Sequence, residues 1–251
     1  MKWPKRVVLV RHGESEGNVR SPDDISFDDK ANHEFALTEK GKQQARLTGK
    51  YVRAKYGEFD SYFCSTFRRT QETLSLLCPE SVPVIDSRLN ELWRGIWHTM
   101  SKEKVLTLYP EEASIREREG EYHYRPPGGQ SCQDVEVMIH SFIHCLRADY
   151  VNKNVLISAH GNWMLLFWRI MLNRQPSEFE SRYKGNKYKN CALAIYERVG
   201  ESLCLVGDNV TSFWPTARRA SVRRAERIYR GKTNGRHFVP PTDSSVKNRK
   251  V

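Results

Sequence analysis

Long apolar runs are missing from this sequence of 251 residues. No segment approaches the ~18 uninterrupted apolar residues that a membrane-spanning helix needs. The first residues, MKWPKR, lead directly into a short strand-like run, so we expect no secretory signal peptide there. These absences argue against a membrane or secreted protein, and we expect a cytoplasmic one.

Paired cysteines and nucleotide-binding motifs are missing as well. The six cysteines are scattered without a C-x-x-C pair, which predicts reduced packing residues and no disulfide framework. His140 and His144 lie one helical turn apart, as metal ligands can, but no cysteine or carboxylate joins them in a motif. Walker loops and dinucleotide-binding fingerprints are absent. We therefore expect surface histidines, with metal binding as a minor alternative, and no cofactor.

Positive charge is plentiful but unevenly distributed. The formal net charge is +11, and residues 207–251 contribute +8 of it through eleven basic and three acidic side chains. We expect a basic helix over residues 215–230 followed by a disordered tail, so that a domain of residues 1–212 precedes a basic segment of residues 213–251. A solvated helix face explains such a segment, and nucleic-acid binding is the minor alternative.

Polar residues gather after two apolar runs. Residues 7–10 are typical of a strand buried on both faces of a parallel sheet, and Arg11 and His12 follow them. Residues 155–159 repeat this pattern before His160. Ligands bind at the carboxyl ends of strands in open α/β sheets, so neighbouring strands would bring both imidazoles to one pocket. A hydrogen-bonded structural histidine is the alternative for either residue alone.

The rest of the chain alternates between helical and strand-like periodicity, which indicates the α/β class. Residues 21–34 are polar without periodicity and predict an active-site loop. Thr38 and Ser131 are predicted to cap helix N-termini. We expect helices at residues 38–56, 66–77, 101–120, from 131 onward, 163–172 and 176–182, and strands at residues 59–64, 82–85, 190–197 and 202–207, the last two as a hairpin or sheet edge.

Two arginines stand at the start of the predicted helix at residues 66–77. Arg68 and Arg69 are unfavourable there because the N-terminus of the helix macrodipole is positive. A bound phosphate would explain them, since helix N-termini and guanidinium groups both bind this anion. A solvated surface pair is the alternative. Glu91 lies between apolar and aromatic residues, a setting typical of a carboxyl that acts as a general acid.

In their order along the chain, these residues resemble the histidine phosphatase superfamily, also called the phosphoglycerate-mutase-like family. The signature of that family is Arg-His-Gly-Glu with Asn six residues after the His, seen here as residues 11–14 and Asn18. Further matches follow in the family's order over most of residues 5–208, at residues 37–41, 65–73, 89–91 with Gly95, 127–131 with Asp134, and 159–161. The resemblance implies a three-layer α/β/α sandwich with a mostly parallel central sheet.

The resemblance also implies roles for the candidate residues. His12 would be the nucleophile that becomes phosphohistidine, and Glu91 the group that exchanges protons with the leaving alcohol and with water. In the family register Arg69, and not Arg68, binds the phosphoryl group. The groups expected to hold the phosphoryl oxygens are Arg11, Arg69, His160 and the Gly161 amide, and the candidate substrate contacts are Ser15, Asn18 and Arg125.

The family contains both phosphatases and mutases. The stretch between Glu91 and His160 is shorter than in the cofactor-dependent mutases, which favours hydrolysis. Residues 124–131 resemble a segment of plant and microbial mutase-like proteins, whereas Gln130 and Met138 depart from the common Glu and Arg. We expect a metal-independent phosphomonoester hydrolase acting on a small phosphorylated metabolite. The alternatives are a cofactor-dependent phosphoglycerate mutase and a catalytically weak phosphate-binding regulatory protein.

Overall fold

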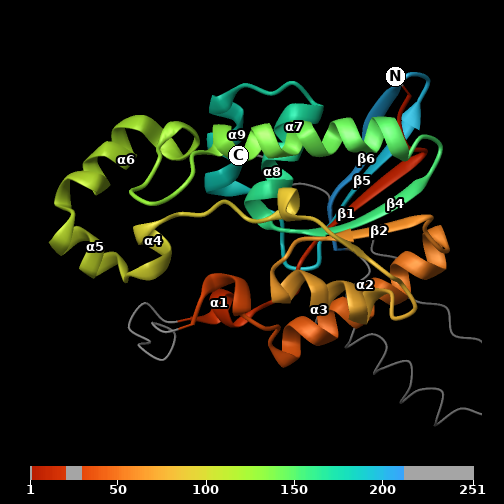
Figure 1. Ribbon diagram of the computed structural model, residues 1–251, viewed down its shortest axis with the longest axis horizontal. Helices are drawn as coiled ribbons and strands as arrows, with labels where there is room; N and C mark the ends of the chain where they lie inside the picture. Colours follow the sequence, from red (N-terminus) through yellow and green to blue (C-terminus); the bar gives the residue numbers. More distant parts are fainter. Residues whose placement is uncertain (1, 21–29, 212–251) are drawn as a thin grey trace, which may run out of the picture. The chain divides into compact units, whose positions relative to one another are not determined.

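A central sheet organises the computed structural model, which describes residues 2–20 and 30–211 (Figure 1). The six strands follow the order β3-β2-β4-β1-β5-β6, and β5 alone runs opposite to the others. The sheet is therefore mostly parallel, as predicted, with a hairpin at one edge. The strands are β1 (Arg6–Arg11), β2 (Ser61–Cys64), β3 (Val84–Ile85), β4 (Asn154–Ala159), β5 (Leu193–Val199) and β6 (Ser202–Val210).

Helices cover both faces of the sheet (Figure 1). Helices α2 (Glu39–Tyr56) and α3 (Arg68–Leu77) lie on one face, and α7 (Cys132–Asp149), α8 (Gly161–Met171) and α9 (Pro176–Gly185) on the other. In β1, Val7 and Leu9 join the apolar cluster under α7 and α8, whereas Val8 and Val10 join the cluster under α2 and α3. The strand is thus buried on both faces, and the predicted three-layer sandwich is confirmed.

A helical segment extends beside the sandwich between residues 96 and 123 (Figure 1). It consists of α4 (Ile96–Thr99), α5 (Lys102–Leu108) and α6 (Pro110–His123). The single helix expected at residues 101–120 was wrong, because Tyr109 leaves the helical region and Pro110, which has no N–H to donate, begins a new helix. The remaining short elements are α1 (Glu16–Val19) and the 3-10 helices η2 (Asn32–Glu34) and η3 (Ser87–Leu89).

The predicted helix caps hold in the structure. The Thr38 hydroxyl accepts the Gly41 N–H at 3.1 Å, and Ser131 forms a capping box with Asp134.

All six cysteines are free thiols, and both His140 and His144 are exposed on α7. Within the described ranges no helix has the length and apolar content to cross a membrane. Of the active-site loop predicted at residues 21–34, the structure describes residues 30–34, which include η2. The predictions for residues 213–251 lie outside the described residues.

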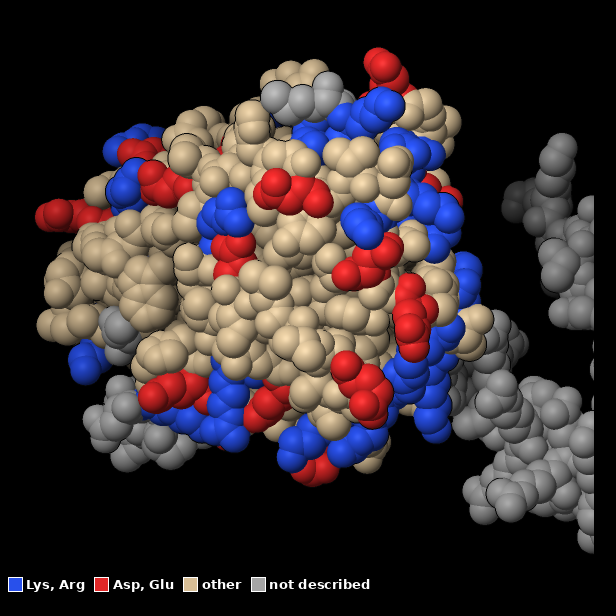
Figure 2. Space-filling model, turned by 45° about the vertical axis from the view of Figure 1, so that its right-hand side comes forward, with Lys and Arg blue, Asp and Glu red and all other residues tan. Residues whose placement is uncertain are grey.

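Charged side chains of both signs are mixed on one face of the domain. Lys and Arg side chains alternate with Asp and Glu side chains on the face drawn in Figure 2. This mixing agrees with the small net charge that the sequence assigns to the chain before residue 207. A mixed surface of this kind favours solubility over non-specific binding of polyanions.

Two glycines allow the turn after β1 to pack against the start of α2. A Cβ on Gly41 would lie 2.0 Å from the Glu14 carbonyl oxygen, and one on Gly13 would lie 2.6 Å from the Gly41 carbonyl oxygen. Both clashes are with backbone atoms, which no change of rotamer relieves. The residues that follow β1 therefore depend on this contact for their position.

Gly41→Ala is expected to lower the free energy of unfolding by about 1–3 kcal/mol, although Ala usually favours a helix. Chemical denaturation would measure this loss. Gly185→Ala is a matched control because a Cβ there, at the end of α9, meets nothing within 4 Å. If Gly41→Ala is as stable as the wild type and as Gly185→Ala, the close backbone contact at Gly41 does not constrain the fold.

Candidate active site

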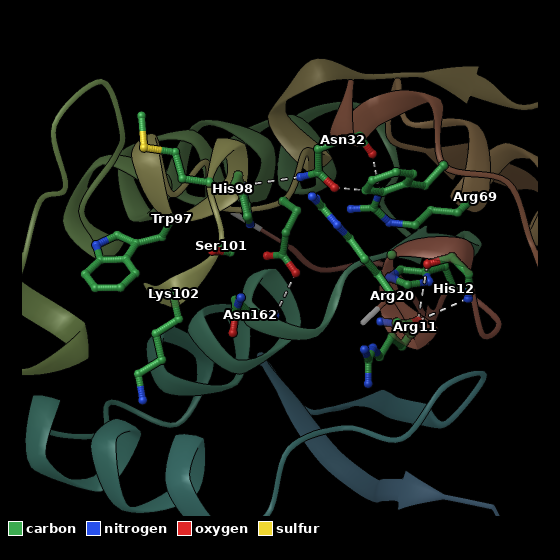
Figure 3. Close-up of a pocket in the computed structure, with 16 residues that line it drawn as sticks. Arg11, His12, Arg20, Asn32, Arg69, Trp97, His98, Ser101, Lys102 and Asn162 are labelled. Atoms are coloured by element: carbon green, nitrogen blue, oxygen red, sulfur yellow. Dashed lines mark hydrogen bonds between the residues drawn. The ribbon is translucent and has the colours of Figure 1, made fainter. Parts of the chain in front are cut away.

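The carboxyl ends of β1 and β4 bring the two predicted histidines together. Arg11 is paired with Ala159 in the parallel register, so His12 and His160 follow side by side. Their ring centroids lie 5.3 Å apart at an interplanar angle of 62°. A cavity of about 410 Å³ opens beside them (Figure 3), and its lining includes Arg11, His12, Ser15, Asn18, Arg69 and Glu91.

The His12 ring is fixed by the backbone of its own turn. Its Nδ1 lies 2.7 Å from the Gly13 carbonyl oxygen, which can only accept, so Nδ1 carries the proton and Nε2 is left with a lone pair. The side chain is 3% exposed. Burial, and then the Arg69 and Arg11 charges, hold the pKa of His12 well below its ordinary value. His12 is therefore a neutral imidazole with a nucleophilic nitrogen.

His160 is fully buried and held by a hydroxyl network. Its Nε2 lies 2.7 Å from Ser65 Oγ, which in turn lies 2.8 Å from Thr70 Oγ1. Burial is again the main reason why the pKa of His160 lies well below its ordinary value, followed by the charge of Arg69. Its Nδ1 has no hydrogen-bond partner in the described part of the chain. A buried polar atom without a partner is costly, and a bound anion beside the rings would relieve that cost.

Two guanidinium groups stand beside these imidazoles (Figure 3). Arg11 donates through Nη1 to the Tyr188 carbonyl oxygen at 2.6 Å, and a Cβ on Gly161 would lie 3.2 Å from Arg11 Nε. Arg69 is 5% exposed, and burial lowers its pKa to about 10. Arg68 instead lies on the surface in an ion pair with Glu72 at 2.7 Å. Of the two predicted arginines, only Arg69 lines the cavity.

Glu91 reaches the cavity from the loop after η3. Its Oε1 accepts the Leu92 N–H at 3.0 Å, and its Oε2 accepts the N–H of Asn162, in the first turn of α8, at 3.3 Å. The carboxyl is near enough to Arg11 and Arg69 to raise the pKa of both guanidinium groups. These two backbone donors fix the carboxyl at the cavity wall, facing the two arginines.

The predicted substrate contacts divide into two groups. Ser15 and Asn18 line the cavity, but Asn18 Oδ1 already accepts from the Ser15 N–H at 3.1 Å and from Asn190 Nδ2 at 2.9 Å. Asn190 Nδ2 also donates to the His12 carbonyl oxygen at 3.2 Å. Arg125 is exposed outside this lining and donates to Asp134 Oδ1 at 2.5 Å.

Sequence reasoning did not single out the other residues that line the cavity, although Asn32 lies in the active-site loop predicted at residues 21–34. The lining also includes Arg20, Asn32, Trp97, His98, Met100, Ser101, Lys102 and Asn162. Most of them come from η2 and from the segment around α4, whose sequences carry no motif. Burial, and then the charge of Arg94, lowers the pKa of His98 to about 4. No group of three or more described His, Cys, Asp or Glu side chains is arranged to hold a metal ion.

Acidification from pH 7 to pH 5 is expected to destabilise the fold. His12, His98 and His160 have lowered pKa values, so the unfolded chain binds more protons than the native one once the pH falls below about 6.5. Each imidazole contributes a slope of up to about 1.4 kcal/mol per pH unit, and the stability is fully present only above pH ~6.5. Urea unfolding at several pH values would measure the slope.

His140→Gln is the control for this measurement because His140 is exposed on α7. This variant should keep the wild-type slope, whereas His98→Asn should reduce it. Free energies of unfolding that do not change between pH 7 and pH 5 would contradict the prediction.

A sequence profile of the histidine phosphatase superfamily (branch 1) matches residues 7–210. The chain belongs to the histidine phosphatase superfamily. It is 28% identical over 220 residues to the phosphoglycerate mutase-like protein AT74H of Arabidopsis thaliana, covering 77% of this chain and 74% of that protein. It is 34% identical over 181 residues to a 2,3-bisphosphoglycerate-dependent phosphoglycerate mutase of Gloeobacter violaceus, covering 69% of this chain and 78% of the mutase.

A solved structure agrees with the histidine phosphatase fold. The mycobacterial glucosyl-3-phosphoglycerate phosphatase superposes with a TM-score of 0.66 at 22% identity, covering 82% of this chain and all of that one. The predicted family and fold class are thus confirmed. Phosphatases and mutases of this superfamily are enzymes, and the cavity beside His12 occupies the carboxyl end of the sheet, where the sequence placed the site.

Proposed function

We propose that this protein is a phosphomonoesterase that hydrolyses small phosphorylated metabolites through a phosphohistidine on His12. One observation carries the proposal. His12 is a buried neutral imidazole whose Nδ1 is tied to the Gly13 carbonyl oxygen, between the cations of Arg11 and Arg69. A nucleophile in that state, beside charges that neutralise a phosphoryl group, is what phosphoryl transfer needs.

The reaction proceeds in two transfers. His12 Nε2 attacks phosphorus and forms an N–P bond while the ester P–O bond breaks, and Glu91 gives its proton to the departing alkoxide. A water molecule then attacks the phosphohistidine, its proton returns to Glu91, and the N–P bond breaks to release phosphate. Arg11, Arg69 and the neutral His160 hold the equatorial oxygens, and the positive charges of the two arginines stabilise the negative charge that spreads over these oxygens in the transition state. These steps need no metal ion.

The leaving group faces the wall formed by α4 and the start of α5. Trp97 and Lys102 lie across the cavity from Arg11 and His12 (Figure 3). This wall provides an aromatic surface, a hydroxyl at Ser101 and a cation. Such a lining suits a polar metabolite of modest size.

Phosphoglycerate mutation is the second candidate. The relative from Gloeobacter violaceus, 34% identical over 181 residues, is named a bisphosphoglycerate-dependent mutase. A mutase returns the phosphoryl group from His12 to a second hydroxyl and must exclude water meanwhile. The same catalytic groups serve both reactions, so the test must follow both products.

The test is a panel of phosphomonoesters, including 3-phosphoglycerate, incubated with the protein in EDTA. Each substrate is tested with and without 2,3-bisphosphoglycerate, and free phosphate and isomerised product are measured together. Phosphate release that His12→Ala abolishes is the expected result. Isomerisation that depends on the bisphosphate would make the protein a mutase. If neither free phosphate nor isomerised product forms, the protein is a phosphate-binding protein without turnover.

A further inference from the structure

Asn32 connects two walls of the cavity. It begins η2, and its backbone carbonyl oxygen and Oδ1 accept from Arg69 Nη1 at 2.7 and 3.3 Å. Its Nδ2 lies 3.4 Å from His98 Nδ1 on the far side (Figure 3). The side chain therefore lies between a residue of α3 and a residue of α4.

His98 determines which way the Asn32 amide points. The backbone N–H of Arg94 donates to His98 Nδ1 at 3.2 Å, so Nδ1 is an acceptor and carries no proton. Asn32 can then only donate to it, through Nδ2, and this places Oδ1 toward Arg69. The pKa of His98, lowered to about 4 by burial, keeps the ring neutral and the acceptor available near pH 7.

This arrangement fixes one edge of the Arg69 guanidinium. Nη1 is used by Asn32, and the Phe67 ring lies 4.7 Å from the guanidinium carbon. No other hydrogen bond joins the guanidinium to the described residues. The remaining N–H groups are therefore left for an anion, with the plane of the group already set by Phe67 and Asn32.

We propose that Asn32 and His98 are positioning residues for Arg69. Asn32 holds Nη1 of Arg69 so that the remaining N–H groups of the guanidinium can donate to the phosphoryl oxygens. His98 holds the Asn32 amide in the orientation in which Oδ1 accepts from Arg69. The inference rests on the proposed function, because it assigns these two residues to the same phosphoryl site. Neither side chain needs to touch the substrate.

The experiment compares four proteins: wild type, Asn32→Leu, Arg69→Ala and the double variant. Leu resembles Asn in size and removes both side-chain hydrogen bonds. In the wild-type background we expect kcat/KM to fall by about 10-fold or more, mainly through kcat, as when a supporting residue is removed. In the Arg69→Ala background the same substitution should change kcat/KM by less than about twofold, because residues that act as a unit are not additive.

Substitutions of His98 test the orientation of the amide. His98→Phe removes the acceptor and should lose activity like Asn32→Leu, whereas His98→Asn offers Oδ1 near the position of Nδ1 and should restore most of it. His144→Leu is the control, because His144 is exposed on α7 and lies outside the cavity lining.

Orthovanadate binding, measured by calorimetry, separates this inference from the proposed function. If the wild type does not turn over but binds vanadate, and Asn32→Leu weakens binding only where Arg69 is present, the positioning role stands and the hydrolase proposal fails. The inference is overturned if Asn32→Leu keeps wild-type activity and affinity, or loses as much in the Arg69→Ala background. Equal activities of His98→Phe and His98→Asn would show that His98 has no positioning role.

Discussion

Replacement of His12 by Ala is expected to abolish turnover, with a loss of at least about 10⁴-fold in kcat. The reason is that no other nitrogen atom occupies the position of His12 Nε2, from which the phosphoryl group is attacked. His160 is the nearest imidazole, but its Nε2 is engaged with Ser65 at 2.7 Å. Phosphate release is the first measurement. An acid-labile phosphoenzyme, trapped in the wild type and absent from the variant, is the second.

His12→Asn and a surface histidine complete this test. His12→Asn keeps a polar side chain of similar reach, so its inactivity would exclude a mere loss of polarity. His140→Ala, on the exposed face of α7, should keep full activity. Wild-type turnover in either His12 variant would rule out the proposed nucleophile.

Arg69→Ala is expected to lower kcat by about 10²–10³-fold, the usual cost of removing a donor that stabilises the charge of a transition state. Arg69 is 5% exposed and its charge acts on both imidazoles, where few waters screen it. KM should change less than kcat, because the interaction strengthens as charge spreads over the phosphoryl oxygens. Steady-state kinetics on the best substrate of the panel would measure both parameters.

The neighbouring arginine provides the control. Arg68→Ala removes the same side chain one position earlier, from a surface ion pair with Glu72. Such pairs contribute about 0–1 kcal/mol, so both activity and stability should stay close to wild type. Equal losses of activity in the two variants would mean that Arg69 has no special role.

The features that could be predicted from the sequence depend on residues close together in the chain. A run of apolar residues followed by His-Gly marks both β1 and β4, because burial on two faces requires an uninterrupted apolar segment. Thr38 and Ser131 mark helix starts for an equally local reason, since a side-chain oxygen accepts an N–H within the same turn. The family register then separated Arg69 from Arg68, which composition alone does not do.

The parts that were missed depend on distant segments. Asn32 and His98 meet Arg69 only after η2, α3 and α4 have packed, and neither lies in a recognisable motif. Arg125 lies outside the cavity lining and pairs with Asp134 near the start of α7, so its role as a substrate contact stays a prediction. The break at Tyr109 was missed because charged residues on both sides of Pro110 favour helix equally.

The central position of β1 also determines when the site can form during synthesis. Arg6 is paired with Asn154 on one side and with Glu197 on the other, so β1 has no strand partner until most of the domain exists. On the ribosome His12 emerges early, after an apolar strand with exposed hydrogen-bonding groups, a kind of segment prone to aggregation. A nascent chain that ends before β4 would therefore have neither strand partner of β1, and it would lack His160 and the activity that depends on it.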